Sequence, residues 1–98
     1  MDDAERLAYL GMMLEAAKSP METLLLLYLD YAQRRPGGGA VSRRQIEMEL
    51  GISGRTFRRH MLPLYERRHV VIHKREDAWG HPLPDVAELA IPSRKGEG

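Results

Sequence analysis

Residues 42–68 have the sequence SRRQIEMELGISGRTFRRHMLPLYERR, which predicts two helices joined by a short turn. A capping-box pattern at Ser42 opens the first helix. Gly51 tolerates the left-handed backbone conformation that ends many helices. Ser53 is a favourable N-cap for the second helix, which we expect over residues 54–68. The stretch therefore predicts a helix-turn-helix unit.

The second helix of this unit has two chemically different faces. Phe57, Met61 and Leu64 follow spacings of four and three residues, which predicts that they form one buried face. The opposite face carries basic and hydroxyl side chains in the first two turns. A helix that enters the major groove of DNA needs hydrogen-bond donors in those turns. The residues that we expect to contact bases are Arg55, Thr56, Arg58 and Arg59.

Two further arginines lie in the first turn of the preceding helix. Positive charge at that position opposes the helix dipole, so a purely solvent-exposed role is unfavourable. The N–H groups at the start of a helix also bind phosphate. We therefore expect Arg43 and Arg44, together with the N-cap Ser53, to contact the DNA backbone.

An amphipathic helix is predicted at the start of the chain, over residues 3–18. Asp2 and Glu5 have the spacing of a capping box, and the apolar residues that follow form one stripe. The stripe consists of Leu7, Leu10, Leu14 and Ala17. It either packs within the chain or forms the seam of a dimer, and the small size of the chain favours the dimer.

A second helix is predicted over residues 20–34. Ser19 caps it, a proline follows at the first helical position, and Glu22 completes a capping box. The helix is apolar on nearly all sides, which places Leu24–Leu27 in the core. The Pro-Gly-Gly-Gly sequence at residues 36–39 ends it with a flexible connection.

The residues after the helix-turn-helix unit change to the pattern of strands. Val70-Val71-Ile72 is β-branched and predicts a strand to about Arg75. The glycine and prolines of residues 76–85 predict a loop. Residues 86–91 predict a returning antiparallel strand, and residues 40–41 a very short strand ahead of the unit.

The stretch from Leu50 to Val71 resembles the winged helix-turn-helix of bacterial and archaeal transcription regulators, most closely the GntR and MarR types. Those families have a Leu-Gly-Val-Ser turn, then Thr-Val-Arg, a leucine farther along the helix, and Gly-Leu-Val at the start of a hairpin wing. The matching positions are Leu50 to Ser53, Thr56 to Arg58, Leu64, Val70 and Val71. The order of elements is similar over residues 20–91.

The resemblance implies a recognition helix in the major groove and a wing at an adjacent minor groove or at the backbone. It adds Lys74 and Arg75, on the wing, to the expected backbone contacts. Two positions depart from the family pattern. Arg68-His69 replaces the glycine before the wing, so that turn is expected to be made differently. Pro63 removes one backbone hydrogen bond of the recognition helix and favours a kink or an early end.

The distribution of charge supports a polyanionic partner. The net charge of the 98 residues is only +1, but residues 42–75 carry nine Lys/Arg against three acidic residues. The chain has no cysteine, which excludes disulfides and thiolate chemistry. It has no apolar run of membrane-spanning length and no basic, signal-like start. We therefore expect a cytoplasmic protein with no membrane partner.

No catalytic, metal or cofactor motif accompanies the basic stretch. The four histidines, His60, His69, His73 and His81, lie outside any HExxH or Cys-His pattern, so we expect no metal site and no cofactor. No nucleophile elbow or phosphate-binding loop indicates an enzyme, and no small-molecule effector site is evident. Trp79 has two interpretations. It is either a wing-tip contact or, as we slightly favour, a side chain folded back onto the domain.

These observations together predict a mainly α structure with a small β wing, a winged helix-turn-helix domain. The domain is expected over residues 1–92, with an N-terminal helix in residues 1–18, a core in residues 20–91 and a mobile tail in residues 93–98. The expected function is sequence-specific binding of double-stranded DNA by a small homodimeric transcription regulator. The alternatives are a protein-interaction adaptor on the same fold and a plasmid or viral protein of replication or partition.

Overall fold

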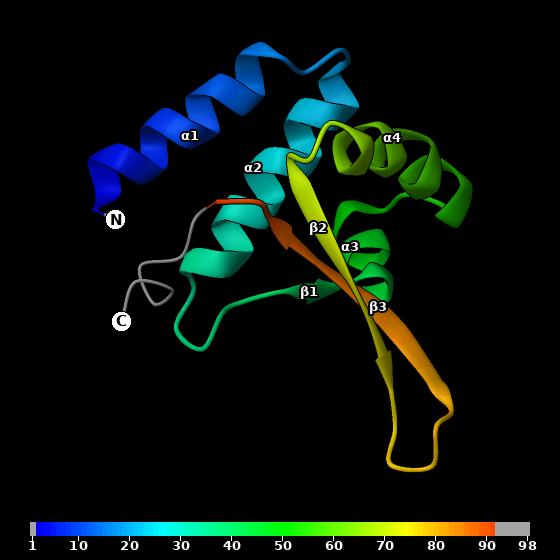
Figure 1. Cartoon of the computed structure of the whole chain (residues 1–98). Coiled ribbons are helices and arrows are strands. Elements are labelled where there is room, and N and C mark those ends of the chain that lie inside the picture. The colour runs from blue at the N-terminus through cyan, green and yellow to red at the C-terminus, as the bar shows by residue number, and fades with distance from the viewer. Residues whose placement is uncertain (1, 92–98) are drawn as a thin grey trace.

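The computed structural model describes residues 2–91 and contains four helices and a three-stranded sheet (Figure 1). The elements are α1 (Asp3–Glu15), α2 (Pro20–Arg34), β1 (Val41–Ser42), α3 (Arg43–Leu50), α4 (Gly54–Glu66), β2 (Val70–Glu76) and β3 (Pro82–Leu89). A mixed α+β structure that is mainly helical is therefore confirmed. The predicted tail, residues 93–98, lies outside the described residues.

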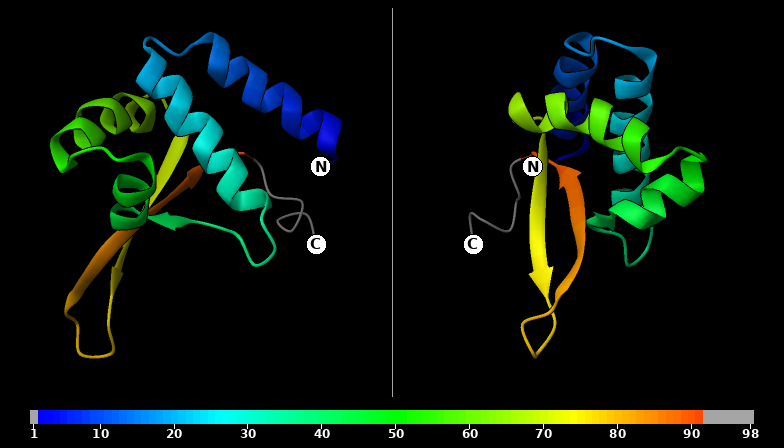
Figure 2. Two further views of the ribbon diagram at one scale, coloured as in Figure 1. Left: turned by 180° about the vertical axis from the view of Figure 1, so that it is seen from behind. Right: turned by 90° about the vertical axis from the view of Figure 1, so that its right-hand side faces the viewer.

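The sheet is antiparallel, and β3 is its central strand. The β2–β3 hairpin extends away from the helices, as both views of Figure 2 show. β1 pairs only with Val86 and Ala87, near the root of the hairpin. The backbone N–H of Leu89 also donates to the side chain of Gln33 in α2 at 2.9 Å. The root is thus held by β1 and α2.

The predicted loop over residues 76–85 is wrong, because β3 already begins at Pro82 and the connection is confined to residues 77–81. Pro82 and Pro84 favour a loop by their local preference. They lie where β3 pairs with β2 on one side only, since β1 ends its pairing at Val86. A proline is tolerated at such an edge because its missing N–H costs no ladder hydrogen bond.

A β-bulge divides the hairpin into a root and a tip. His73 lies opposite Val86, but Arg75 lies opposite Leu83, so β3 has one residue more than β2 between these pairs. A bulge of this kind bends the strand and increases its local twist. The tip beyond it is the part of the hairpin that β1 and α2 do not support.

The hydrophobic core lies between α2, α4 and the inner face of the sheet, with α1 packed on α2. Its most completely buried large side chains are Leu25, Leu26, Leu29, Ile46, Met61, Leu64 and Val70. The expectation that all of Leu24–Leu27 are core residues is wrong for Leu24 and Leu27, which are 40% and 45% exposed. The side chains of four consecutive residues are spread over about 300° around a helix, so some of them must point outward.

The apolar stripe of α1 packs mainly within the chain. Leu10 is buried together with Met13, while Leu14 and Ala17 are half-buried against the core. Leu7 is exposed. Most of the predicted dimer seam is thus already covered by the chain's own residues.

The α1 helix ends at Glu15, three residues before the predicted end. A buried carboxylate of α2 binds the connection that follows. Lys18 donates its backbone N–H to Oε1 of Glu22 at 3.0 Å, so this N–H makes no helical hydrogen bond. Ser19 caps α2 as predicted, by accepting from the N–H of Glu22 at 3.2 Å. The predicted capping box is wrong, however, because the Glu22 carboxylate bonds Lys18 and the guanidinium of Arg67 instead of Ser19.

The ion pair between Glu22 and Arg67 is buried, since Glu22 is only 4% exposed. Burial raises the pKa of the Glu22 carboxyl, but the Lys18 N–H and the Arg67 guanidinium outweigh burial and hold the pKa below its ordinary value of 4.5. Burial, followed by the charge of Arg67, lowers the pKa of the nearby His69.

We expect the Glu22 carboxylate to make stability depend on pH. Because its folded-state pKa is lowered, its contribution is present above the ordinary pKa and is lost as pH falls through the folded-state value. Urea unfolding between about pH 7 and pH 3 measures this loss, which Glu22→Gln should reduce. Both proteins are compared in a His69→Gln background, because the charge of Glu22 also raises the pKa of His69. Equal pH dependence in the two proteins would contradict the expectation.

Candidate nucleic-acid interface

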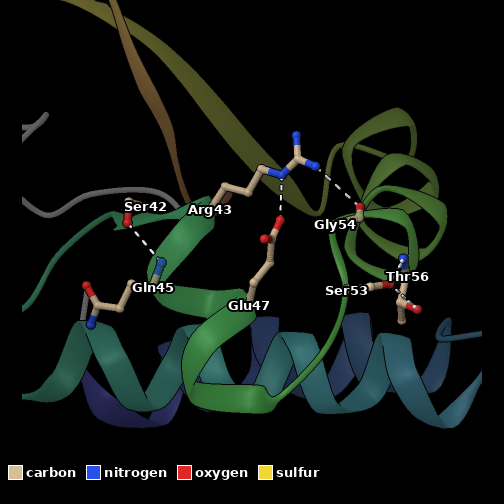
Figure 3. Close-up of polar contacts among 7 residues, drawn as sticks. All are labelled: Ser42, Arg43, Gln45, Glu47, Ser53, Gly54 and Thr56. Atoms are coloured by element: carbon tan, nitrogen blue, oxygen red, sulfur yellow. Dashed lines mark hydrogen bonds and ion pairs between the residues drawn. The ribbon is translucent and has the colours of Figure 1, made fainter.

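The unit formed by α3 and α4 is fixed by its caps and its turn (Figure 3). Ser42 accepts a hydrogen bond from the N–H of Gln45 at 3.1 Å and caps α3. Gly51 has φ 65°, the left-handed conformation that the sequence predicts there. Ile52 then donates its N–H to the carbonyl of Glu47 at 3.0 Å. The start of α4 is therefore held at a defined angle to α3.

The first turn of α4 uses two of the predicted contact residues in its own cap. The Ser53 hydroxyl accepts from the backbone N–H of Thr56 and donates to the Thr56 hydroxyl, both at 3.1 Å. Figure 3 shows these two side chains turned toward each other. Their hydroxyls remain near the surface but are already hydrogen-bonded in the free protein.

The two faces of α4 divide as the sequence predicts. Phe57, Met61 and Leu64 are buried. The arginine side of the helix is exposed, and none of the described acidic residues forms an ion pair with its arginines, Arg55, Arg58 and Arg59. Unpaired guanidinium groups in the first two turns of a helix are available to an external anion without first breaking an internal contact.

Arg43 and Arg44 have different environments at the start of α3. Arg43 donates through Nε to Glu47 at 2.6 Å and through Nη2 to the carbonyl of Gly54 at 3.4 Å (Figure 3). Its guanidinium also lies 5.4 Å from the ring centre of Phe57. Arg43 thus fastens α3 to α4, while Arg44 is exposed and makes no ion pair with any of residues 2–91.

The arginines of α4 line a concave surface. A groove of about 750 Å³ runs over the first half of the helix, lined by Arg43, Gly54, Arg55, Arg58, Arg59 and Leu62. It adjoins a second cavity of about 420 Å³ between α4 and the hairpin. Leu62 and Tyr65 line this second cavity and are exposed, but they are not among the contact residues expected from the sequence. Their spacing of four and seven residues from Arg58 is the signal that places all three on one side of α4.

The hairpin carries the predicted Lys74 and Arg75, but it is not a basic arm. The ammonium of Lys74 lies 3.2 Å from a carboxylate oxygen of Asp85, and Nε of Arg75 donates to the carbonyl of Pro84 at 3.0 Å. Residues 70–89 contain two Lys/Arg against four acidic residues. The positive charge available to an anion is therefore concentrated on α4 and at Arg44.

Trp79 lies at the tip of the hairpin and is 80% exposed, so the expectation that it folds back onto the domain is wrong. The turn beneath it is well hydrogen-bonded. Asp77 accepts through Oδ1 from the backbone N–H groups of Trp79 and His81, at 2.8 and 2.9 Å. The N–H of His81 contributes most to holding the pKa of Asp77 below its ordinary value, with the N–H of Trp79, against an opposing effect of burial. The indole is presented outward on an ordered turn.

The end of α4 combines a proline and a left-handed turn. The helix continues past Pro63 to Glu66, and Arg67 donates its N–H back to the Pro63 carbonyl at 3.0 Å. Arg68 then takes φ 64°, the conformation that usually selects glycine. The N–H of His69 donates to Leu64 at 2.9 Å, which completes a Schellman motif. The turn before the hairpin is thus left-handed although it lacks the glycine.

Arg68→Gly is expected to stabilise the protein by about 1 kcal/mol, because glycine adopts a positive φ without the steric cost that a side chain carries there. Thermal unfolding should show a rise in Tm of about 4–8 °C. The matched control is Arg59→Gly, at an exposed position inside α4, which should lower Tm because glycine weakens a helix interior. A fall in Tm for Arg68→Gly would contradict the left-handed assignment.

The predicted histidines are dispersed. His73 pairs with Glu88, His81 with Asp77, and His60 lies 3.4 Å from the Ser19 hydroxyl. Within residues 2–91, no three His, Asp or Glu side chains gather as metal ligands. Among the helices described, none is both long and apolar enough to cross a bilayer.

Comparison with protein-family models, with curated proteins and with solved structures gives no significant match to this chain. The function of the chain is therefore inferred from the geometry and charge of the surface formed by α3, α4 and the hairpin.

Proposed function

We propose that this chain is a winged helix-turn-helix protein that binds double-stranded DNA through α4. The observation that carries the proposal is the row of exposed, unpaired arginines on the first two turns of a helix that is rigidly capped and packed on its other side. Arginine binds the O6 and N7 atoms of guanine through two parallel hydrogen bonds. A row of this kind suits the major groove.

In this proposal Arg55, Arg58 and Arg59 contact base edges and flanking phosphates, with Thr56 beside them. Arg44 neutralises a phosphate at the start of α3. Arg43 acts mainly by holding α3 and α4 together, since its charge is already paired with Glu47.

The hairpin takes the place of the wing. Its root adjoins the side of α4 that carries Arg58, because both line the same cavity. Lys74 and Arg75 reach the DNA backbone only where their contacts with Asp85 and Pro84 are exchanged for phosphate contacts. The acidic residues of the hairpin limit its contribution to affinity, so α4 supplies most of the binding free energy.

We also propose that the protein is a transcription regulator that acts as a homodimer in the cytoplasm. Two-fold symmetric proteins bind palindromic half-sites about one helical turn apart. Exposed apolar side chains of α2, namely Leu24, Leu27 and Tyr31, support self-association more directly than the mostly covered stripe of α1. Sedimentation equilibrium with and without bound DNA tests this part of the proposal.

The decisive experiment selects bound sequences from random duplex DNA at two salt concentrations. A palindromic consensus supports a dimeric, sequence-specific protein. Steeply salt-dependent binding without a consensus indicates a nonspecific role. Absence of binding at low salt overturns the proposal and favours a protein-interaction adaptor, for which the exposed apolar residues of α2 are the supporting observation.

Trp79 provides an internal probe of the wing, because it is the only tryptophan of the chain. We expect its fluorescence in the free protein to be that of a hydrated indole, readily quenched by acrylamide. Cognate DNA should shield it if the tip enters a groove. The Arg58→Ala variant, which weakens the proposed binding, serves as a control. Acrylamide quenching that is unchanged on saturation with DNA would exclude a wing-tip contact.

A further inference from the structure

The buried contact between Glu22 and Arg67 joins segments that are 45 residues apart in the sequence. Glu22 lies in the first turn of α2, and Arg67 is the residue that caps the end of α4. Oε1 of Glu22 also accepts from the N–H of Lys18 in the connection between α1 and α2, at 3.0 Å. One carboxylate oxygen therefore ties this connection to the end of α4.

This contact is unlike the others that hold α4. The side chains of Phe57, Met61 and Leu64 pack into the core, and hydrophobic packing has no directional preference. An ion pair with a charge-assisted hydrogen bond has a defined direction and length. The pair therefore restricts the rotation and axial position of α4, which apolar burial alone leaves less defined.

The pair lies away from the surface proposed to bind DNA. Glu22 is buried, and the side chain of Arg67 is only 24% exposed. Neither residue lines the arginine groove or the cavity between α4 and the hairpin. His60 and His69 are the neighbouring titratable groups on α4 and after it. Any effect of the pair on DNA binding must then act through the position of α4.

We infer that Glu22 and Arg67 are positioning residues that fix the orientation of α4 against the start of α2, and so align the arginines of α4. The consequence for DNA binding rests on the proposed function, but the effect on the orientation of α4 does not. A buried pair that adds little net stability can still specify a single arrangement of the elements that it joins.

The chain contains no cysteine, so spin labels can be placed at chosen sites without removing native residues. Labels at Leu27→Cys in α2 and Arg59→Cys in α4, both exposed positions, report the distance between the two helices. We expect a narrow distance distribution in the otherwise wild-type protein and a broader or displaced one with Glu22→Gln. Arg67→Lys keeps the charge and should give an intermediate distribution. The control is Asp30→Asn, which breaks the pairs of Asp30 with Arg6 and Arg34 but touches no residue of α4.

DNA binding provides the second readout, measured with the unlabelled variants under conditions in which each is fully folded. Glu22→Gln should weaken binding to the preferred duplex by about tenfold, the scale of one misaligned base contact. The slope of log K against log salt should not change, because no phosphate contact is removed. A purely structural role would lower Tm and leave both the distance distribution and the affinity of the folded protein unchanged.

The outcomes separate the two proposals. If the distance distribution of Glu22→Gln or of Arg67→Lys has the same width and the same mean as that of the wild type, the inference is overturned. If Glu22→Gln does not fold, the Arg67→Lys variant decides the question alone. A broadened distribution in a protein whose wild type binds no DNA supports the positioning role and overturns the proposed function.

Discussion

Arg58→Ala is expected to lower the affinity for the preferred duplex by about 1–3 kcal/mol, the discrimination supplied by one bidentate contact to a base. Arg58 is exposed on α4, lines both the arginine groove and the adjoining cavity, and has no ion-pair partner among the described residues. The loss should be much smaller on unrelated duplexes, because sequence preference is carried by base contacts. Fluorescence anisotropy with both kinds of duplex measures this difference.

Arg44→Ala gives the contrasting result. It should weaken binding to all duplexes by a similar factor and reduce the slope of log K against log salt by about one phosphate contact. Arg34→Ala, an arginine of α2 that already pairs with Asp30, is the control and should change neither quantity. Unchanged binding in both Arg58→Ala and Arg44→Ala would rule out the assignment of these residues to the interface.

Phe57→Ala is expected to destabilise the protein by about 3–5 kcal/mol, the usual cost of truncating a buried aromatic side chain. Phe57 lies on the buried face of α4, and its ring makes a cation–π contact with the guanidinium of Arg43. A loss of this size is a large part of the total stability of a small domain. Urea unfolding followed by circular dichroism measures the change in the free energy of unfolding.

The matched control lies five residues farther along the same helix. Leu62 is 49% exposed, so Leu62→Ala should cost far less. A cost for Phe57→Ala no greater than that for Leu62→Ala would show that Phe57 does not anchor α4. Arg43→Met should fall between them, since it removes the contacts of Arg43 with Glu47 and Gly54 but leaves the core filled.

The local features of the interface could be predicted from the sequence because their determinants are close together in the chain. Ser53 accepts a hydrogen bond from the N–H of Thr56, only three residues later in the chain. The left-handed conformation of Gly51 depends only on the backbone freedom of glycine itself. The spacing of Phe57, Met61 and Leu64 likewise sets the buried face of α4. Short-range rules of capping and periodicity decide such features.

The features that the sequence analysis missed depend on distant partners. Glu22 has the spacing of a capping box, but Arg67 draws its carboxylate away from the cap. Pro82 and Pro84 signal a loop, yet an unpaired strand edge accepts them. From the sequence Arg43 is expected to be free to bind phosphate, but in the structure its guanidinium is bonded to Glu47 and to the carbonyl of Gly54. In each case a tertiary neighbour outweighs the local preference.

The bulge opposite Lys74 gives the two parts of the hairpin different mechanical properties. The root is bonded on its far side to β1 and to Gln33, so we expect its amide protons to exchange with solvent only when the sheet itself opens. The tip has β2 and β3 alone, and we expect its amide protons to exchange through a local opening that leaves the rest of the domain intact. We therefore expect the tip to move more easily than the root, and in the proposed complex with DNA this would let the tip adapt to grooves of different width while α4 stays in place.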